Sequence, residues 1–269
     1  KYNKMINIII ISNIITMFSN IMIMTILYIL YDKYTPYYIT HYLLTLYYSF
    51  YLKIFYSDRD ISHDFNHAYT VAKNSIYIAK QTKKSLKLKD IRIIIVSSLL
   101  HDAYDHKYVK DSSNIKKIII PILLSLGFMS DDIILVFDII DNISYSDELK
   151  KRENDEIPYI VFPINPTHQL LRDIVSDADK MESLGSIGVI RMIQYNNHQL
   201  NQSKIFTNEW LIKTYDHIKQ HTNTKLRKLI THKYIRTEVG KQLCAQKLDE
   251  LIKIVGDESQ TLKYIINYS

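Results

Sequence analysis

The amino-acid sequence predicts an all-α protein, and three observations support this prediction. Glycine and proline are scarce, with five of each among 269 residues, so the chain lacks the turn signals that short-stranded β folds need. Apolar residues recur at helical spacing in one segment after another. No segment alternates between apolar and polar residues for long. We therefore expect a bundle of helices.

The composition limits the kind of partner that the protein binds. Hydrophobic residues make up 47% of the chain, which is enough to bury a core without disulfides. The single cysteine, Cys244, excludes an internal disulfide and agrees with a cytoplasmic location. The net charge of +6 suits a phosphorylated small molecule. Because the basic residues are scattered among acidic ones, we expect no nucleic acid partner.

Residues 1–34 form a separate hydrophobic segment. The stretch from Met5 to Tyr31 contains no charged residue and is long enough to cross a bilayer as a helix. Its uncharged polar residues include three on one helical face: Asn13, Thr16 and Asn20. Two alternatives therefore stay open, a membrane anchor for a cytoplasmic domain and a soluble amphipathic helix. No small-residue cleavage site follows, which argues against a secretory signal.

Residues 35–257 are expected to form the main domain. It begins at Thr35-Pro36, a cap residue followed by proline at the first helical position. Helices are expected at 37–56, 65–82, 89–104, 116–127, 131–142, 168–184, 187–196, 208–221 and 238–255. The polar stretch 144–156 is expected to be a loop, and 157–167, with its three prolines, an irregular segment. Residues 258–269 are expected to be a C-terminal tail.

Two histidines and two aspartates are the candidates for a metal centre: His67, His101, Asp102 and Asp177. A divalent metal used in hydrolysis takes imidazole and carboxylate ligands in an incomplete shell, which leaves positions for water and substrate. Adjacent residues on a regular helix point about 100° apart. His101 and Asp102 can therefore face one ion only near a helix end, and the apolar run does end at this pair. A single histidine is more often a surface or core residue, so the prediction rests on the order of all four.

Four segments carry a resemblance to a known family: SHDFNHAYTV (62–71), LLHDAYDHK (99–107), NISY (142–145) and DADKMESLGSIGVIR (177–191). In this order they resemble the HD superfamily of metal-dependent phosphohydrolases, named after its His-Asp doublet, and within it the bacterial YpgQ/YedJ-like branch. A later segment, RTEVGKQL (236–243), also fits that branch. The resemblance covers about residues 37–257, and the Asp-Ala-Asp block is its most specific part.

The resemblance implies an HD-domain helical bundle in which His67, His101, Asp102 and Asp177 bind a divalent metal. Manganese is the metal that we expect first, with magnesium, cobalt, nickel, zinc and iron as alternatives. The resemblance also implies hydrolysis of nucleoside triphosphates to monophosphate and pyrophosphate by a metal-activated water. Asp105 matches an acidic position that orients or deprotonates this water. Its alternative role is to orient a ligand histidine.

Three basic residues are candidates for contacts to substrate phosphates: Lys107, Lys180 and Arg191. Phosphoryl transfer depends on positioning and charge stabilisation, although solvated surface is the plainer interpretation of such residues. Asp179 and Glu182 are expected to support the metal site or to cap the helix. The branch usually has arginine and aspartate where this chain has Lys180 and Glu182, which puts the substrate preference in doubt.

Two other functions stay open. The chain could instead be a nucleoside monophosphate phosphatase, or another phosphomonoesterase or phosphodiesterase of the same superfamily. It could also be a non-catalytic module that binds a metal or a nucleotide. A phosphorylated small molecule, most simply a nucleotide, is the expected partner for the enzymes.

Overall fold

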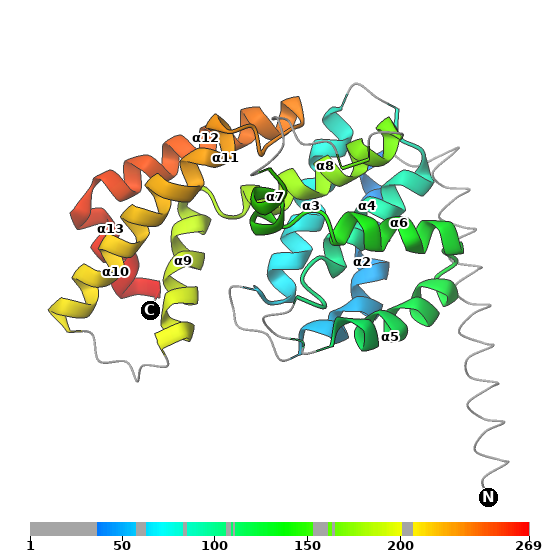
Figure 1. Cartoon of the computed structure of the whole chain (residues 1–269), viewed down its shortest axis with the longest axis horizontal. Coiled ribbons are helices and arrows are strands. Elements are labelled where there is room, and N and C mark those ends of the chain that lie inside the picture. The colour runs from blue at the N-terminus through cyan, green and yellow to red at the C-terminus, as the bar shows by residue number, and fades with distance from the viewer. Residues whose placement is uncertain are drawn as a thin grey trace, which may run out of the picture.

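The computed structural model describes residues 37–57, 63–82, 85–105, 109, 111–152, 161–162, 165–200 and 207–268. All regular structure in these residues is helical (Figure 1), which confirms the predicted all-α fold. The hydrophobic segment 1–34 and Lys107 lie outside the described residues. Within the described part of the chain, no helix is long and apolar enough to span a bilayer.

The helices follow one another in this order: α2 (Tyr37–Leu52), η1 (Lys53–Tyr56), α3 (Phe65–Gln81), α4 (Leu88–Leu100), α5 (Ser112–Ser125), α6 (Ser130–Ile140), α7 (Tyr145–Arg152), α8 (Pro166–Met181), α9 (Gly185–Leu200), α10 (Asn208–His221), η3 (Thr222–Leu226), α11 (Arg227–Thr231), α12 (Glu238–Gly256) and α13 (Glu258–Tyr268).

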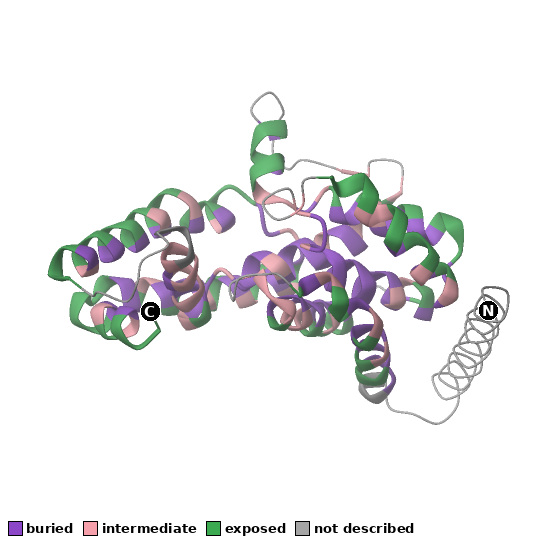
Figure 2. Cartoon of the chain, turned by 90° about the horizontal axis from the view of Figure 1, so that it is seen from below, coloured by how far each residue is buried: buried purple, intermediate pink, exposed green. Residues whose placement is uncertain are grey.

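The larger of two hydrophobic clusters is built around α4, against which α2, α3, α6 and α8 pack. All eight residues from Ile93 to Leu100 in α4 are buried, and Figure 2 shows the buried residues concentrated where the helices pack against one another. A helix that is apolar on every side is stable only where neighbours cover it, and Figure 1 shows α4 among the surrounding helices. The C-terminal end of α4, which is followed by His101 and Asp102, is therefore held inside the domain.

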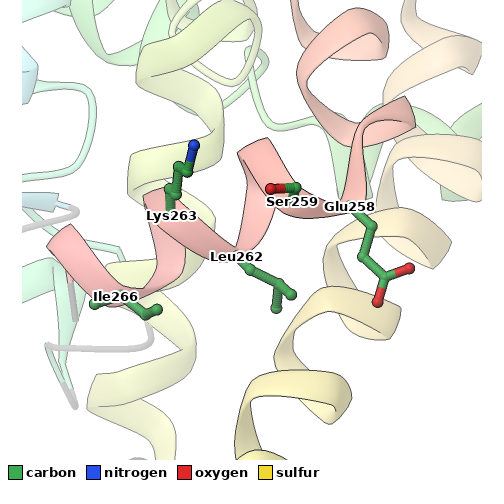
Figure 3. A pocket seen from close by; sticks show the side chains of 5 residues that line it. All are labelled: Glu258, Ser259, Leu262, Lys263 and Ile266. Atoms are coloured by element: carbon green, nitrogen blue, oxygen red, sulfur yellow. The ribbon is translucent and has the colours of Figure 1, made fainter.

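The second cluster consists of α9 to α13, on the left of Figure 1. Residues 258–268, which we expected to be a tail, instead form α13, and this helix packs against α9, α10 and α12. The helix has a buried side because Thr261 and Ile265, one turn apart, are both fully covered. Other side chains of α13 line a hollow (Figure 3): Glu258, Ser259, Leu262, Lys263 and Ile266.

Several helices begin at residues whose side chains cap them. The side chains of Asp64, Asn165 and Thr237 accept hydrogen bonds from backbone amides in the first turns of α3, α8 and α12. The expected loop at 144–156 was wrong, because it contains α7. The sequence conceals this helix because the residues that it buries, Glu148 and Arg152, are both charged.

Glu148 is the centre of a buried ionic network. Its Oε1 accepts hydrogen bonds from Arg152 Nη2 at 2.5 Å and Arg236 Nη2 at 2.7 Å. Its Oε2 accepts from Arg172 Nη2 at 2.9 Å and Lys180 Nζ at 3.4 Å. Burial opposes the charge of this carboxylate, but Lys180 and Arg172 outweigh it and lower the pKa of Glu148 to about 2. One carboxylate thus serves four cations.

This network also joins the two hydrophobic clusters. Arg152 of α7 donates to the backbone oxygens of His232 at 2.7 Å and Lys233 at 3.1 Å. Its guanidinium lies 4.0 Å from the centre of the Tyr234 ring, a cation–π contact. Because Arg236 directly precedes the cap of α12, the loop between α11 and α12 is fixed against α7 and α8.

Replacing Glu148 with glutamine should lower the free energy of unfolding by about 3 kcal/mol or more, because four cations lose the negative charge that they share. Urea denaturation followed by circular dichroism measures this change. The adjacent Asp147 is exposed, so Asp147→Asn is the matched control and should change stability by less than about 0.5 kcal/mol. Equal, small effects of the two substitutions would contradict the role of the network.

His41 of α2 should make stability depend on pH. It is buried, and burial followed by the charge of Lys80 lowers its pKa from 6.5 to about 4. Between these two values the unfolded chain binds more protons than the folded one, so stability should fall as pH falls from 6.5 to 4. In His41→Gln the urea midpoint should fall less over this range. The exposed His232→Gln should behave as wild type, and identical pH profiles for all three proteins would refute the assignment.

Candidate metal centre

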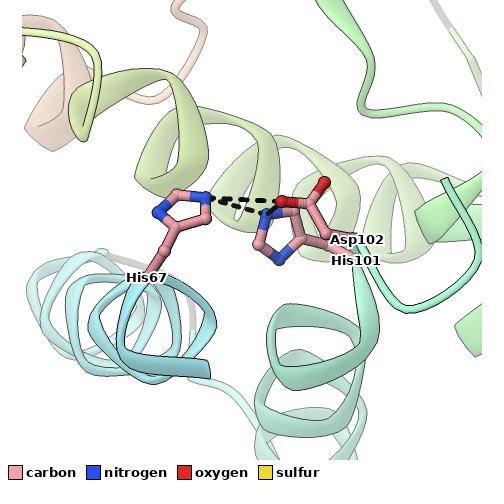
Figure 4. Close-up of side chains that lie close together, drawn as sticks. All are labelled: His67, His101 and Asp102. Atoms are coloured by element: carbon pink, nitrogen blue, oxygen red, sulfur yellow. Dashed lines mark hydrogen bonds and ion pairs between the residues drawn. The ribbon is translucent and has the colours of Figure 1, made fainter. Parts of the chain in front are cut away.

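His67 and His101 point their imidazole Nε2 atoms at the same place, 3.1 Å apart (Figure 4). His67 lies in the first turn of α3, where its backbone amide donates to the capping side chain of Asp64 at 3.0 Å. His101 follows the last residue of α4. Both side chains are buried, so two elements far apart in the sequence bring two ring nitrogens together inside the domain.

The ring of His101 is fixed by its second nitrogen. Nδ1 lies 2.8 Å from the backbone oxygen of Ser98, and a carbonyl can only accept, so Nδ1 carries the hydrogen. Nε2 is then left with its lone pair directed into the cluster when the ring is neutral. Metal-binding histidines usually have this arrangement, with one nitrogen held by the protein and the other presented to the ion.

Asp102 brings a carboxylate to the same point. Its Oδ2 lies 3.2 Å from His101 Nε2 and 3.7 Å from His67 Nε2. Residues 101–104 form a turn after α4, which lets two adjacent side chains face one centre, as the sequence predicted. Oδ2 is buried and accepts no hydrogen bond from the described residues. The three residues form a group that could hold a metal ion.

The second carboxylate at the cluster belongs to Asp179 and not to Asp177. Asp179 Oδ1 lies 3.3 Å from His67 Nε2 and 3.5 Å from His101 Nε2. Residues two apart on a helix point about 200° away from each other, so only one of these aspartates can face the histidines. The sequence pattern named Asp177 as the ligand and gave Asp179 a supporting role, and the structure reverses these positions.

Asp177 of α8 instead binds the two residues that precede α12. Its carboxylate accepts hydrogen bonds from Arg236 N at 3.0 Å, from Thr237 N at 2.7 Å and from Thr237 Oγ1 at 2.7 Å. A Cβ at Gly240 would lie 2.5 Å from Asp177 Oδ2, so glycine is required for this close approach. Burial raises the pKa of Asp177 to about 6, although the bonds from Thr237 and Arg236 favour its charged form.

The electrostatics of the cluster differ between its two histidines. Burial, followed by the charge of Arg191, lowers the pKa of His67 to about 4. Burial also opposes the charge on His101, but Asp102 and Asp179 outweigh it and raise its pKa well above 6.5. The histidines in turn lower the pKa values of both carboxylates. Two imidazole nitrogens and two ionised carboxylates therefore meet here, a donor set that suits a divalent transition metal.

The remaining predicted site residues have different positions. Arg191 of α9 is close enough to His67 and Glu182 to shift the pKa values of both, so it lies beside the cluster. Lys180 is buried and bonded to Glu148, Ser176 and the backbone oxygen of Ile143, so it does not face the histidines. Asp105 follows the turn, and its backbone amide donates to Asp102 O at 3.2 Å.

Tyr195 is a neighbour of the cluster that sequence reasoning missed. The ring centre of His63 lies 5.9 Å from that of Tyr195 and 6.4 Å from that of His67. Tyr195 follows Arg191 by four residues on α9, so both belong to one face of that helix. The spacing was visible in the sequence, but nothing in it indicated that α9 would turn this face towards α3.

The fold and the site define an all-helical protein with a buried His-His-Asp group that could hold a metal ion. No protein-family model matches the chain, and no curated protein matches it. Several solved structures share its fold.

A protein from Lactobacillus plantarum has a TM-score of 0.56 and 20% identity over 80% of this chain and 94% of its own. The Lin1889 protein from Listeria innocua has a TM-score of 0.53 and 18% identity, over 83% of this chain and 97% of its own. Bacillus subtilis YpgQ, in a complex with ADP, has a TM-score of 0.51 and 18% identity, over 77% of this chain and 94% of its own. Identities this low establish a common fold, and the presence of YpgQ agrees with the resemblance seen in the sequence.

The different positions of Asp177 and Asp179 lead to different expectations for substitution. Asp179→Asn should weaken Mn²⁺ binding at least about tenfold without unfolding the protein, because one carboxylate leaves the donor set. Asp177→Asn should retain Mn²⁺ binding but lower the free energy of unfolding by about 1–3 kcal/mol, because bonds to α12 are lost. Calorimetric titration and urea denaturation measure the two effects. Wild-type affinity in Asp179→Asn would show that this carboxylate is not a ligand.

Proposed function

We propose that this protein is a metal-dependent phosphohydrolase that cleaves nucleoside triphosphates to monophosphate and pyrophosphate. The observation that carries the proposal is the convergence of His67, His101 and Asp102 on one point, with Asp179 beside them. A donor set of two imidazoles and two carboxylates leaves coordination positions open for water and substrate on a six-coordinate ion such as Mn²⁺.

In this proposal His67, His101, Asp102 and Asp179 hold the metal. A bound divalent ion polarises a phosphoryl oxygen and lowers the pKa of a coordinated water. The protein supplies the geometry: Ser98 fixes the ring of His101, and α4 holds the pair at its end. The two carboxylates neutralise most of the charge of a divalent ion.

Asp105 and Arg191 have the other proposed roles at this site. Asp105 lies three residues after Asp102, and its carboxylate orients or deprotonates the attacking water. Arg191 supplies positive charge, which already lowers the pKa of His67, and this charge receives the phosphates of the substrate. We do not assign Lys180 to the substrate phosphates, because its ammonium group is bonded within the Glu148 network.

A nucleotide is the substrate class that several observations favour together. The quoted sequence segments resemble a branch of nucleotide pyrophosphohydrolases, and YpgQ, which shares the fold, has been crystallised with ADP. The net charge of +6 suits an anionic substrate. The nucleoside monophosphate phosphatase and the binding module are the alternatives, and one assay distinguishes all three.

The assay offers nucleoside mono-, di- and triphosphates to the full chain with Mn²⁺ or with chelator, and measures pyrophosphate and orthophosphate separately. Pyrophosphate from triphosphates, only with metal, is the expected result. Orthophosphate from monophosphates would replace the proposal with a phosphatase. If neither product is released by a protein that still binds Mn²⁺, the chain is the non-catalytic binding module.

The Asp102→Ala variant tests whether the cluster is responsible. Loss of this ligand should reduce metal-dependent hydrolysis at least about a hundredfold, with the helical circular dichroism spectrum retained. Asp249→Ala, on the exposed side of α12, is the matched control and should keep wild-type activity. Undiminished hydrolysis in Asp102→Ala would place the chemistry elsewhere in the chain.

A further inference from the structure

A second candidate site lies between α8, α11 and α12. A cavity of about 850 Å³ is lined by Gln169, Asp173, Ile230, Lys233, Ile235, Arg236, Lys241, Gln242 and Ala245. None of these residues belongs to the metal centre. The volume is within the range of sites for small organic molecules, about 300–1,000 Å³, and residues from three helices and a loop form its wall.

The charged side chains around this cavity are mostly positive. Lys233, Arg236 and Lys241 line it, against one acidic residue, Asp173. Asp173 already serves other partners, since its Oδ1 accepts from Gln169 Nε2 at 2.7 Å and from Arg172 Nη1 at 3.0 Å. Among the described residues, the half-exposed Lys241 pairs with an exposed glutamate of its own helix, Glu238. The cavity therefore has an excess of positive charge.

Arg236 gives independent support for an anionic ligand. Its side chain is only 9% exposed, and a buried guanidinium normally has its donors satisfied. Nη2 donates to Glu148 at 2.7 Å, but Nε is buried without a hydrogen-bond partner. Asp173 Oδ1 lies 3.8 Å from Nε, beyond hydrogen-bond distance.

The cations behind the wall of the cavity add to this excess. Glu148 is shared by four of them, and Arg236 is the one that also lines the cavity. Asp177, the next carboxylate on α8, is occupied by the backbone amides of Arg236 and Thr237. Among the described residues, Arg236 thus pairs with a carboxylate that three other cations share and has Asp173 Oδ1 only at 3.8 Å.

We propose that this cavity binds the phosphate group of a small molecule, with Arg236, Lys233 and Lys241 as its ligands. A guanidinium donates two parallel hydrogen bonds to phosphate oxygens, and lysines add point charges at the rim. The apolar wall, formed by Ile230, Ile235 and Ala245, receives the remainder of the molecule. The proposal does not rest on the hydrolase function, because the two sites share no residue.

The test is a calorimetric titration of the full chain with inorganic phosphate in the presence of chelator, so that metal-dependent binding is absent. The double variant Lys233→Gln/Lys241→Gln should weaken saturable phosphate binding at least about tenfold. These side chains are exposed or half exposed and lie outside the Glu148 network, so the fold should persist. Lys253→Gln, an exposed lysine further along α12, is the matched control and should bind as wild type.

His101→Ala completes the design, because it disables the metal centre and should leave phosphate binding unchanged. Phosphate binding that is lost in His101→Ala but kept in the double lysine variant would place the anion at the metal centre and overturn the proposal. Absence of saturable binding to the wild-type protein would overturn it too. Neither result would affect the hydrolase assay, which depends on added Mn²⁺.

Discussion

The structure depends on the ion pairs and hydrogen bonds made by the charged residues that α8 buries. Arg172 and Lys180 converge on Glu148 of α7, while Asp177 accepts the backbone amides that begin α12. Each group is expensive to remove from water, and a buried charge is tolerated only with good partners. Because α8 contributes to the larger hydrophobic cluster and α12 to the second, the bonds from Asp177 also fix the two clusters against each other.

The hydrogen bonds of Asp177 also determine where Asp179 points. Asp179 follows Asp177 by two residues, so its direction towards His67 is set once Asp177 is bound to α12. Ala178 between them is fully buried, and a larger residue there would disturb both contacts. The rotation of α8 about its axis is therefore determined by structural bonds, and the position of Asp179 beside the histidines follows from it.

Sequence reasoning predicted the parts that depend on local pattern. The all-α fold followed from helical periodicity, and His101 with Asp102 stands at a helix end because the apolar run stops there. Sequence reasoning failed where the role of a residue is decided by partners that are distant in the chain. Asp177 and Asp179 are the same residue type two positions apart, so the sequence does not show which of them faces the histidines. The position of α12, which binds Asp177, decides this. Lys180 resembled a phosphate ligand because its acidic partner, Glu148, lay in a stretch expected to be a loop.

These failures have one physical origin, which is that a charged residue does not reveal from sequence whether its partner is a substrate, a metal or another side chain. In this molecule a buried cation with a complete set of protein acceptors, such as Lys180, has a structural role. A buried group with an unsatisfied polar atom requires a further partner. Asp102 Oδ2 and Arg236 Nε are both of this kind. The first is an acceptor among ring nitrogens and suits a cation, whereas the second is a donor among cations and suits an anion.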